Sequence, residues 1–339
     1  MFFTFLATVL ALGVILLACD VFTNGIEWLG KKWNLSHGAV GSILAAIGTA
    51  LPETLLPVIA VFTASNQDAG HKIGVGAIIG APLMLTTLAM FVCGLAVVYF
   101  SRKKIRQPYI SIDSAHMRRD FAFFIGAFLV AVCASFLPVV WMKWAVVALL
   151  VLIYAIYVFK TLGHPGEVSE DLSPLYIAKK NGSPSSALIG IQIFLALAVI
   201  ILGAKLFVGQ VESLSDFFQI SSLILAMIIA PVATELPEKF NSIIWMKSSK
   251  DTLALGNISG ALVFQASIVP SMGIIFTPWI LGRIEFFTVF LTLTAATLLY
   301  LFFRTRSQIS PRMLIGIGGG GYALFLLGVL FFPHLLIGV

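Results

Sequence analysis

Two short motifs place a glutamate directly after a proline inside strongly apolar stretches of the sequence. The first runs from Thr49 to Glu53 and the second from Thr234 to Glu238, 185 residues later, and four of their five positions are identical. A charged side chain at the centre of a membrane helix costs at least ~2.5 kcal/mol, so each glutamate needs a partner or a function. If the two carboxylates meet at one site, they offer the hard oxygen ligands that Ca²⁺ takes.

The residues before each glutamate can add neutral oxygen ligands. A proline inside a helix removes a backbone donor and clashes with the carbonyl four residues earlier, which frees carbonyls beside Thr49 and Thr234. Glu235 lies three residues before Glu238 and shares its face on a helix. Glu235 is therefore a third ligand, a proton carrier, a gating residue or an acid that only tunes the local potential. Carboxylate, hydroxyl and carbonyl oxygens together predict a site for a hard cation.

A structural role is the competing interpretation of these acids. A single membrane glutamate near a helix end can extend to the interface or cap a neighbouring helix. The same Pro-Glu context occurs twice, at Pro52-Glu53 and Pro237-Glu238, and this duplication favours a functional site.

The composition predicts the elements that must position these residues. Of the 339 residues, 59% are hydrophobic and 11% are charged, whereas a soluble domain carries roughly 25% charged residues. The basic residues lie in short runs between apolar stretches, so the net charge of +6 indicates topology and not a nucleic-acid partner. Ten stretches have about the length that crosses a bilayer: 2–22, 37–63, 72–100, 120–139, 142–160, 187–209, 218–246, 252–277, 284–303 and 312–333.

The distribution of Lys and Arg predicts the orientation of these spans. With both termini on the non-cytoplasmic side, 16 of the 21 basic residues fall in cytoplasmic loops. The polar stretch 161–186 then forms a cytoplasmic linker without a packed core, between a first repeat of five helices (1–160) and a second (187–339). An odd number of helices in each repeat inverts the second copy. The predicted fold is therefore an all-α polytopic membrane protein with ten transmembrane helices in two inverted five-helix repeats.

Small residues predict where helices approach each other closely. Similar Gly-x-x-x-Gly-Ala runs occur at 76–81 and 256–261, and a glycine-dense patch lies at 316–321. Asn24, Glu27 and Glu212 are expected at solvated helix ends.

The motifs resemble a known signature. Gly48 to Glu53 and Ala233 to Glu238 are similar to the Gly-Thr-Ser-Leu-Pro-Glu sequences of the two alpha repeats in the cation/Ca²⁺ exchanger superfamily, and the sodium/calcium exchanger branch fits best. The resemblance implies that Glu53 and Glu238 are the principal cation ligands and that Thr49 and Thr234 are neighbouring ligands.

The chain also departs from that signature. The serine after each threonine is Ala50 in the first motif and Glu235 in the second. A polar Asn or Asp of the family, expected in the third and eighth spans, corresponds to Leu85 and Gln265. Gln265 is therefore a candidate ligand, whereas Thr86 and Thr87 are possible substitutes in the first half. These differences leave the choice of coupling ion between Na⁺ and H⁺ open.

The resemblance implies a secondary antiporter that exchanges Ca²⁺ for Na⁺ by alternating access, in which the first and sixth spans move against a core. A proton-coupled antiporter for Ca²⁺ or another divalent cation and a passive cation channel are the alternatives. An enzyme is not expected, because no Ser/His pair or His-rich motif lies at comparable depth. The expected partners are inorganic cations and the lipid bilayer of a prokaryotic-type plasma membrane, without nucleic acid and without a cofactor. The expected assembly is a monomer or a homodimer.

Overall fold

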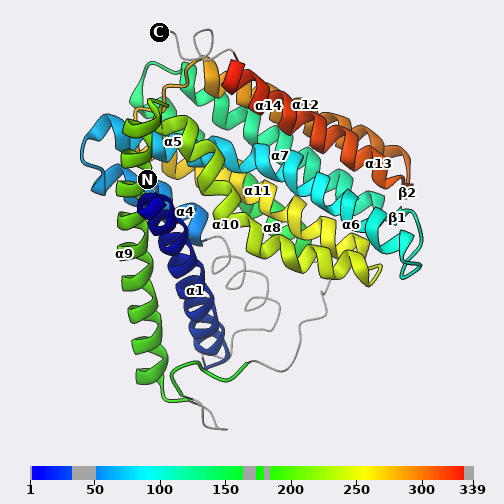
Figure 1. The fold of residues 1–339 in the computed structure, drawn as a ribbon, viewed down its shortest axis with the longest axis horizontal. Helices are drawn as coiled ribbons and strands as arrows, with labels where there is room; N and C mark the ends of the chain where they lie inside the picture. Colours follow the sequence, from blue (N-terminus) through cyan, green and yellow to red (C-terminus); the bar gives the residue numbers. More distant parts are fainter. Residues whose placement is uncertain (1, 33–50, 163–172, 179–183, 332–339) are drawn as a thin grey trace.

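The computed structural model describes residues 2–32, 51–162, 173–178 and 184–331, and nearly all of them are helical (Figure 1). The first half contains α1 (Phe2–Lys32), α4 (Leu51–Thr63), α5 (Gln67–Met84), a π-helical turn η2 (Leu85–Ala89), α6 (Met90–Arg102), strand β1 (Ile110–Ser111), α7 (Ser114–Cys133), a 3₁₀ turn η3 (Ala134–Phe136) and α8 (Val140–Leu162). The second half contains α9 (Ser186–Phe218), α10 (Ser222–Lys247), α11 (Asp251–Phe276), α12 (Arg283–Thr305), strand β2 (Gln308–Ile309), α13 (Pro311–Leu314), a π-helical turn η4 (Ile315–Gly319) and α14 (Gly320–Phe331).

The described residues include 8 helical segments that are long and apolar enough to cross a membrane. Two shorter apolar helical stretches, Thr54–Thr63 and Ser222–Val232, fall within the expected spans 37–63 and 218–246. The all-α membrane architecture is therefore confirmed, whereas the count of ten transmembrane helices stays a prediction. The third expected span is interrupted by η2, but the eighth is the continuous helix α11.

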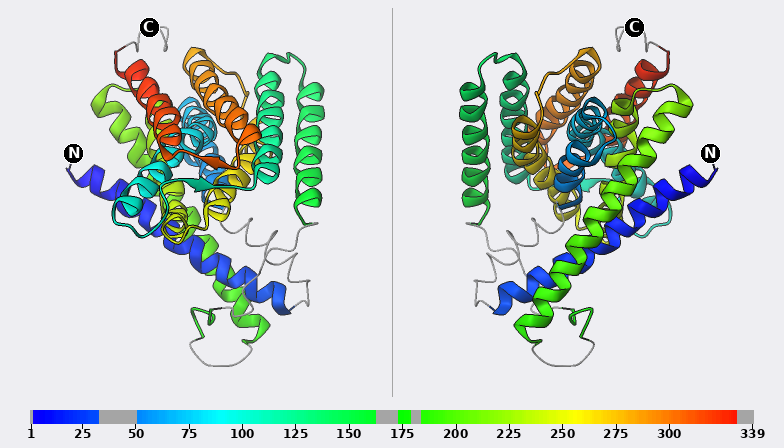
Figure 2. Two further views of the ribbon diagram at one scale, coloured as in Figure 1. Left: turned by 90° about the vertical axis from the view of Figure 1, so that its right-hand side faces the viewer. Right: turned by 90° about the vertical axis from the view of Figure 1, so that its left-hand side faces the viewer.

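The two longest helices, α1 and α9, form a pair that extends beyond the other helices (Figures 1 and 2). They run antiparallel and touch at a glycine on each helix. A Cβ atom on Gly25 of α1 would come within 2.8 Å of Ile193, and one on Gly203 of α9 within 2.8 Å of Ile15. Small residues give lipid-embedded helices the close contact that stabilises them. A buried apolar cluster joins this pair to α4, α5 and α10.

Helix α5 lies directly against α10, and two of its glycines make this possible. A Cβ on Gly76 would lie 2.5 Å from the carbonyl oxygen of Leu223, and one on Gly80 would overlap the Met227 carbonyl. The predicted packing role of the first Gly-x-x-x-Gly run is thus confirmed. In the second run, Gly256 faces the His116 ring and Gly260 faces the Tyr157 hydroxyl.

The glycine-dense patch in the last helical segment also has the predicted packing role. A Cβ atom on Gly318, Gly319 or Gly321 would meet Phe91 or Thr87, where η4 and the start of α14 pack against the third span. A side chain at these positions would separate the two segments.

A buried ion pair fixes the loop between α6 and α7 to the start of α11. The Arg106 guanidinium donates 2.6 and 2.8 Å hydrogen bonds to the two carboxylate oxygens of Asp251, and the side chains are 1% and 2% exposed. Asp251 also accepts a hydrogen bond from the backbone N–H of Ser111, in the strand β1 that pairs antiparallel with β2. One carboxylate therefore ties together the ends of several helices.

Substituting Gly80 tests the contact between α5 and α10. Gly80→Ala should lower the thermal unfolding midpoint in detergent, because the new Cβ pushes the two helices apart. Helix propensity alone predicts the opposite sign, since alanine is favoured over glycine by up to ~1 kcal/mol. Gly126→Ala, at an exposed glycine with nothing within 4 Å, is the matched control and should not lower the midpoint. A Gly80→Ala protein as stable as the control would contradict this packing.

Removing Arg106 tests the buried ion pair. Arg106→Ala leaves the Asp251 carboxylate buried without its guanidinium, and loss of one partner of a buried pair costs about 3–5 kcal/mol. The midpoint should fall well below that of Arg102→Ala, which removes an exposed arginine from the end of α6. Equal midpoints for the two variants would show that the pair does not hold the loop.

Candidate functional site

The two helices that carry the repeated motif, α4 and α10, both pack against α5. Glu53 lies in the first turn of α4, and Glu238 lies in the C-terminal half of α10, which continues as helix through Pro237. The side chains of Glu53 and Glu238 lie outside the described part of the structure, as does the whole of Thr49. Their predicted role as ligands therefore stays a prediction.

Thr234 lies where α4, α5 and α10 meet. The residue is 4% exposed, and its hydroxyl donates a 3.1 Å hydrogen bond to the carbonyl of Ala230 one turn earlier. A small cavity of about 10 Å³, near the minimum for one water molecule, lies between the three helices and is lined in part by Thr234, Pro57 and Pro231. Because the hydroxyl donates to its own helix, its oxygen keeps lone pairs for a ligand on the cavity side.

Glu235 and Gln265 are brought together by α10 and α11. Both residues are buried, at 0% and 1% exposed, and the Gln265 amide nitrogen donates a hydrogen bond to the Glu235 carboxylate. The buried amide oxygen of Gln265 has no hydrogen-bond partner among the residues that the structure describes. A carboxylate and an amide oxygen side by side are hard ligands of the type that Ca²⁺ takes. The structure therefore joins two candidates that are 30 residues apart in the sequence.

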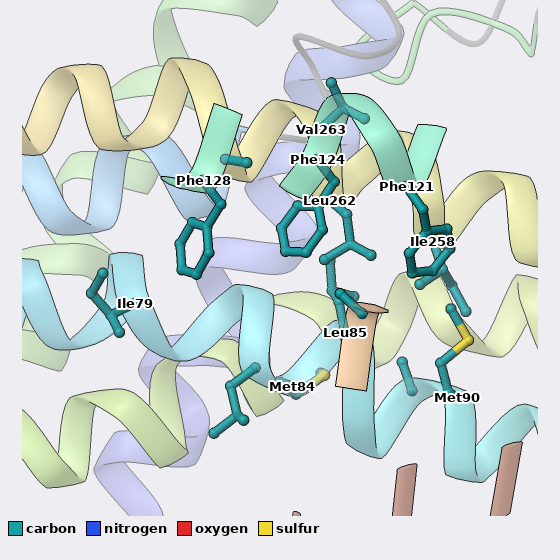
Figure 3. Packing of buried hydrophobic residues seen from close by; sticks show 14 of the residues in the cluster. Ile79, Met84, Leu85, Met90, Phe121, Phe124, Phe128, Ile258, Leu262 and Val263 are labelled. Carbon is teal, nitrogen blue, oxygen red and sulfur yellow. The ribbon is translucent and has the colours of Figure 1, made fainter. Parts of the chain in front are cut away.

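Leu85 contributes packing where the family signature has a polar side chain. It is 0% exposed and lies in an apolar cluster with Phe124, Leu262 and Val263 (Figure 3). The π-helical turn η2 begins at this residue. Such turns add a residue to one helical turn and are frequent at functional sites.

The hydroxyls that follow Leu85 are bonded to their own helix. Thr86 donates a 2.8 Å hydrogen bond to the carbonyl of Pro82, and Thr87 donates to the carbonyl of Leu83. Both residues are fully buried. Their oxygens can accept from a ligand, but their protons are already used within the helix.

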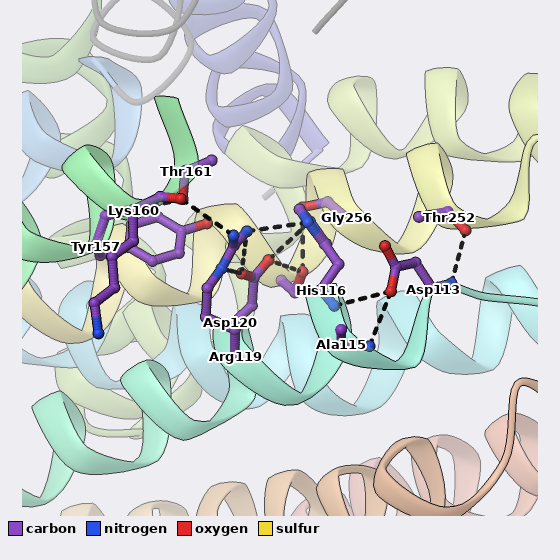
Figure 4. A network of polar contacts seen from close by, with 11 residues as sticks. Asp113, Ala115, His116, Arg119, Asp120, Tyr157, Lys160, Thr161, Thr252 and Gly256 are labelled. Carbon is purple, nitrogen blue, oxygen red and sulfur yellow. Dashed lines mark hydrogen bonds and ion pairs between the residues drawn. The ribbon is translucent and has the colours of Figure 1, made fainter. Parts of the chain in front are cut away.

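A polar network around Asp120 fastens α7 to α11 (Figure 4). Asp120 is fully buried; one carboxylate oxygen accepts hydrogen bonds from Arg119, and the other accepts a 2.7 Å bond from Ser259 on α11. The His116 Nε2 atom lies 3.2 Å from Asp120 Oδ2, the oxygen that accepts the bond from Ser259. The network therefore holds the helix that carries Gln265 in place.

The residues of this network and the Arg106–Asp251 pair were not among the sequence candidates. Asp120 and Asp251 each stand at the start of an apolar stretch, directly after basic residues, and that position is the signal that could have found them. Across the described residues, no group of three His, Cys, Asp or Glu side chains could hold a metal ion. The side chains of Glu53 and Glu238 lie outside the part of the chain to which this observation applies.

Substituting Gln265 tests the joint between α10 and α11. Gln265→Met keeps the volume but removes the amide that donates to Glu235, and a lost partner of a buried group costs about 1–3 kcal/mol. The thermal midpoint should fall, and the rise in midpoint on adding CaCl₂ should shrink. Gln210→Met on α9, at a half-buried position, is the control and should change neither quantity. A Gln265→Met protein with the wild-type midpoint and the wild-type response to CaCl₂ would remove this residue from the site.

Comparison with known proteins gives relatives that match about four fifths of the chain. The chain is 24% identical over 291 residues to a protein of Alkalimonas amylolytica that bears the name "Putative antiporter CaxA", and the match covers 81% of this chain and 82% of CaxA. It is 21% identical over 284 residues to the inner membrane protein YrbG of Escherichia coli, with 80% and 79% of the two chains covered.

Solved structures share the fold. The crystal structure of the H⁺/Ca²⁺ exchanger CAX matches with a TM-score of 0.74 at 16% sequence identity, over 97% of this chain and 82% of that chain. The sodium-calcium exchanger NCX_Mj matches with a TM-score of 0.56 at 20% identity, over 96% of this chain and 98% of that chain. At these identities the likeness establishes the fold alone.

The family model described as sodium/calcium exchanger protein matches residues 3–163 and 188–332, which include both motifs and leave out most of the central linker. Its members are exchangers and not enzymes. The chain is therefore a multi-pass membrane protein that belongs to the sodium/calcium exchanger protein family.

Proposed function

We propose that this protein is a secondary active antiporter that exchanges Ca²⁺ for Na⁺ across the membrane by alternating access. The observation that carries the proposal is the buried pair of Glu235 and Gln265, with the buried Thr234 directly before Glu235 on α10. Thr234 and Glu235 lie on α10, the helix that carries Glu238, and Gln265 lies on the neighbouring helix α11, in a chain whose family exchanges cations. The proposed ligands are Glu53, Glu238, Thr49, Thr234, Glu235 and Gln265.

The proposed architecture has ten transmembrane helices in two inverted five-helix repeats, with both termini on the non-cytoplasmic side. The packing of the described helices supports it. α8 packs against α11, and the α13–η4 segment packs in the corresponding way against α6. The antiparallel pair of α1 and α9 joins the first helix of one repeat to the first helix of the other. The distribution of basic residues supports the orientation.

Exchange follows from the charge of the proposed site. An empty site with several carboxylates in an apolar environment is electrostatically unfavourable, so the site is stable when it holds a cation or protons. Ca²⁺ and its counter-ion then compete for the same oxygens, and occupancy by one excludes the other. Return of the empty carrier is disfavoured for the same reason, and this links the movement of one ion to that of the other.

Coupling to protons is the second candidate, and the surroundings of Leu85 favour it. A Na⁺ site that needs an oxygen at this position cannot form, because Leu85 is packed among apolar side chains. A buried carboxyl group can bind a proton without further ligands. A proton-coupled exchanger of Ca²⁺ or another divalent cation therefore does not need the oxygen ligand that Leu85 cannot supply.

A passive cation channel could use the same acids. The family assignment to exchangers supports antiport over this alternative. The two differ in one property, because flux through a channel does not depend on a counter-ion on the opposite side of the membrane.

Neutralising the motif glutamates tests the proposed site. Glu53→Gln and Glu238→Gln should each reduce Ca²⁺ exchange in proteoliposomes to near background, because a neutral amide cannot balance the charge of Ca²⁺. Both variants should keep the wild-type chromatographic profile and secondary structure. Asp216→Asn, at an exposed acid near the end of α9, is the control and should exchange Ca²⁺ at the wild-type rate. Robust Ca²⁺ exchange by either glutamine variant would refute the site.

A further inference from the structure

A short piece of the central linker is docked on the long helix pair. Residues 173–178, called the strap here, lie against α1 and α9 and contain a turn closed by a 2.9 Å hydrogen bond from the Ala178 N–H to the Leu175 carbonyl. Leu175 is only 2% exposed, although its neighbours Tyr176 and Ile177 are each 44% exposed. The composition predicted a linker without a packed core of its own, and it did not predict that this segment docks on the two helices.

On α1, the strap is bonded to Asn24 and Trp28. The Asn24 amide nitrogen lies 3.3 Å from the Ser173 carbonyl, and the Asn24 oxygen accepts a 3.3 Å hydrogen bond from the Tyr176 N–H. The Trp28 indole donates a 2.9 Å hydrogen bond to the same Ser173 carbonyl. Asn24 is 5% exposed, so the expectation of a solvated helix end is wrong at this residue.

On α9, Gln192 bonds to both the strap and α1. Its side-chain oxygen accepts a 3.1 Å hydrogen bond from the Ile177 N–H of the strap. Its amide nitrogen donates 2.8 and 2.9 Å hydrogen bonds to the Val21 carbonyl and the Asn24 side-chain oxygen of α1. Gln192 is fully buried. One amide therefore joins two helices and the linker.

The exposed edge of the strap makes a further contact with α1. The Tyr176 hydroxyl donates a 2.8 Å hydrogen bond to the Asp20 carboxylate. This bond to a carboxylate, with some burial, raises the pKa of the Tyr176 phenol above its ordinary value. At the start of α9, the Lys32 ammonium group donates a 2.8 Å hydrogen bond to the Pro184 carbonyl.

These bonds satisfy groups that would otherwise oppose the pairing of α1 and α9. Buried amides need partners, and two apolar helices in lipid have little hydrophobic force to hold them together. In the described residues, the strap's side-chain-mediated hydrogen bonds go to α1 and α9 and to none of the other helices. The contacts therefore add to the α1–α9 pair and not to the rest of the bundle.

We propose that the surface formed by α1 and α9 is a docking site for the strap. The docked strap holds the C-terminal part of α1 and the N-terminal part of α9, called the linker ends here, together as one body. For transport, this inference rests on the proposed function: the strap travels with the pair when α1 and α9 move against the core. An intact strap is then required for fast exchange, and the strap does not need to release during the cycle.

Two substitutions two residues apart test the docking. Leu175→Glu places a charge at the buried position and should reduce the docked fraction of the strap roughly tenfold or more. Ile177→Glu makes the same change at an exposed position, where only the backbone N–H is bonded, and should leave the strap docked. Spin labels at Lys31 and Leu188, in a cysteine-free background, measure the distance between the linker ends of α1 and α9.

The distance distribution should broaden in Leu175→Glu and match the wild type in Ile177→Glu. The initial rate of Ca²⁺ exchange should fall severalfold in the first variant only. Unchanged distances in Leu175→Glu would overturn the docking, and a faster exchange rate would show an inhibitory strap instead. If the wild type exchanges no Ca²⁺ but the distances respond as expected, the proposed function fails and the docking stands.

A covalent tether tests whether the strap must release. Asp20→Cys with Tyr176→Cys, in the same cysteine-free background, places two thiols where the exposed edge of the strap meets α1. A tyrosine ring and a hydrogen bond separate these two positions, so a reducible bifunctional thiol reagent about as long as that ring joins them, since a direct disulfide spans only about 4.4–6.8 Å between Cα atoms. The cross-linked protein should exchange Ca²⁺ at the rate of the same protein after reduction. Loss of exchange on cross-linking, recovered on reduction, would show that the strap leaves its docking site in each cycle and would contradict the proposal.

Discussion

Burying a polar group in a membrane protein is costly unless the protein supplies its partner, because a hydrocarbon environment holds no water to replace that partner. In this structure, three buried acids are bonded to partners that join one helix to another, and each such contact is called a joint here. Asp251 joins the loop before α7 to α11 through Arg106, and Asp120 joins α7 to α11 through Ser259. Glu235 joins α10 to α11 through Gln265. The helix α11 takes part in all three joints.

The joints differ in what they leave for function. Arginine side chains bond the carboxylates of Asp120 and Asp251, which makes both suited to fastening helices. Glu235 accepts a hydrogen bond from a neutral amide, whose own oxygen is buried and lies within the same joint. The contact between α10 and α11 therefore brings together two kinds of hard oxygen, whereas the two arginine-bonded contacts keep the surrounding helices fixed. The pair of α1 and α9 is held together by glycines and amides, and it packs on α4, α5 and α10 through apolar side chains without taking part in these three contacts.

The sequence predicted what depends on local pattern. The length of the apolar stretches predicted the helices. The spacing of Gly76 and Gly80 predicted a close helix contact, because a glycine lets a second helix approach whichever residue of that helix faces it. Thr234 and Glu235 became candidate ligands through their spacing from a repeated Pro-Glu pair, and their role as ligands stays a prediction. What was missed depends on residues that meet only after folding. Asn24 looked like a solvated helix end, and its burial depends on Gln192, 168 residues away, and on a linker whose composition predicts only a loop. No pattern within α1 contains that information.

Antiport is the central claim, and Ca²⁺ uptake into proteoliposomes under imposed gradients tests it most directly. Vesicles of the wild-type protein are loaded with Na⁺ at equal pH, or brought to an acidic interior without Na⁺, or given neither gradient, and Ca²⁺ uptake from the outside is followed. The account predicts uptake only when a counter-ion is present inside, with the Na⁺ and proton arms identifying which one. Equal uptake in all three preparations, including the one without a counter-ion gradient, would contradict antiport and indicate a passive cation pathway.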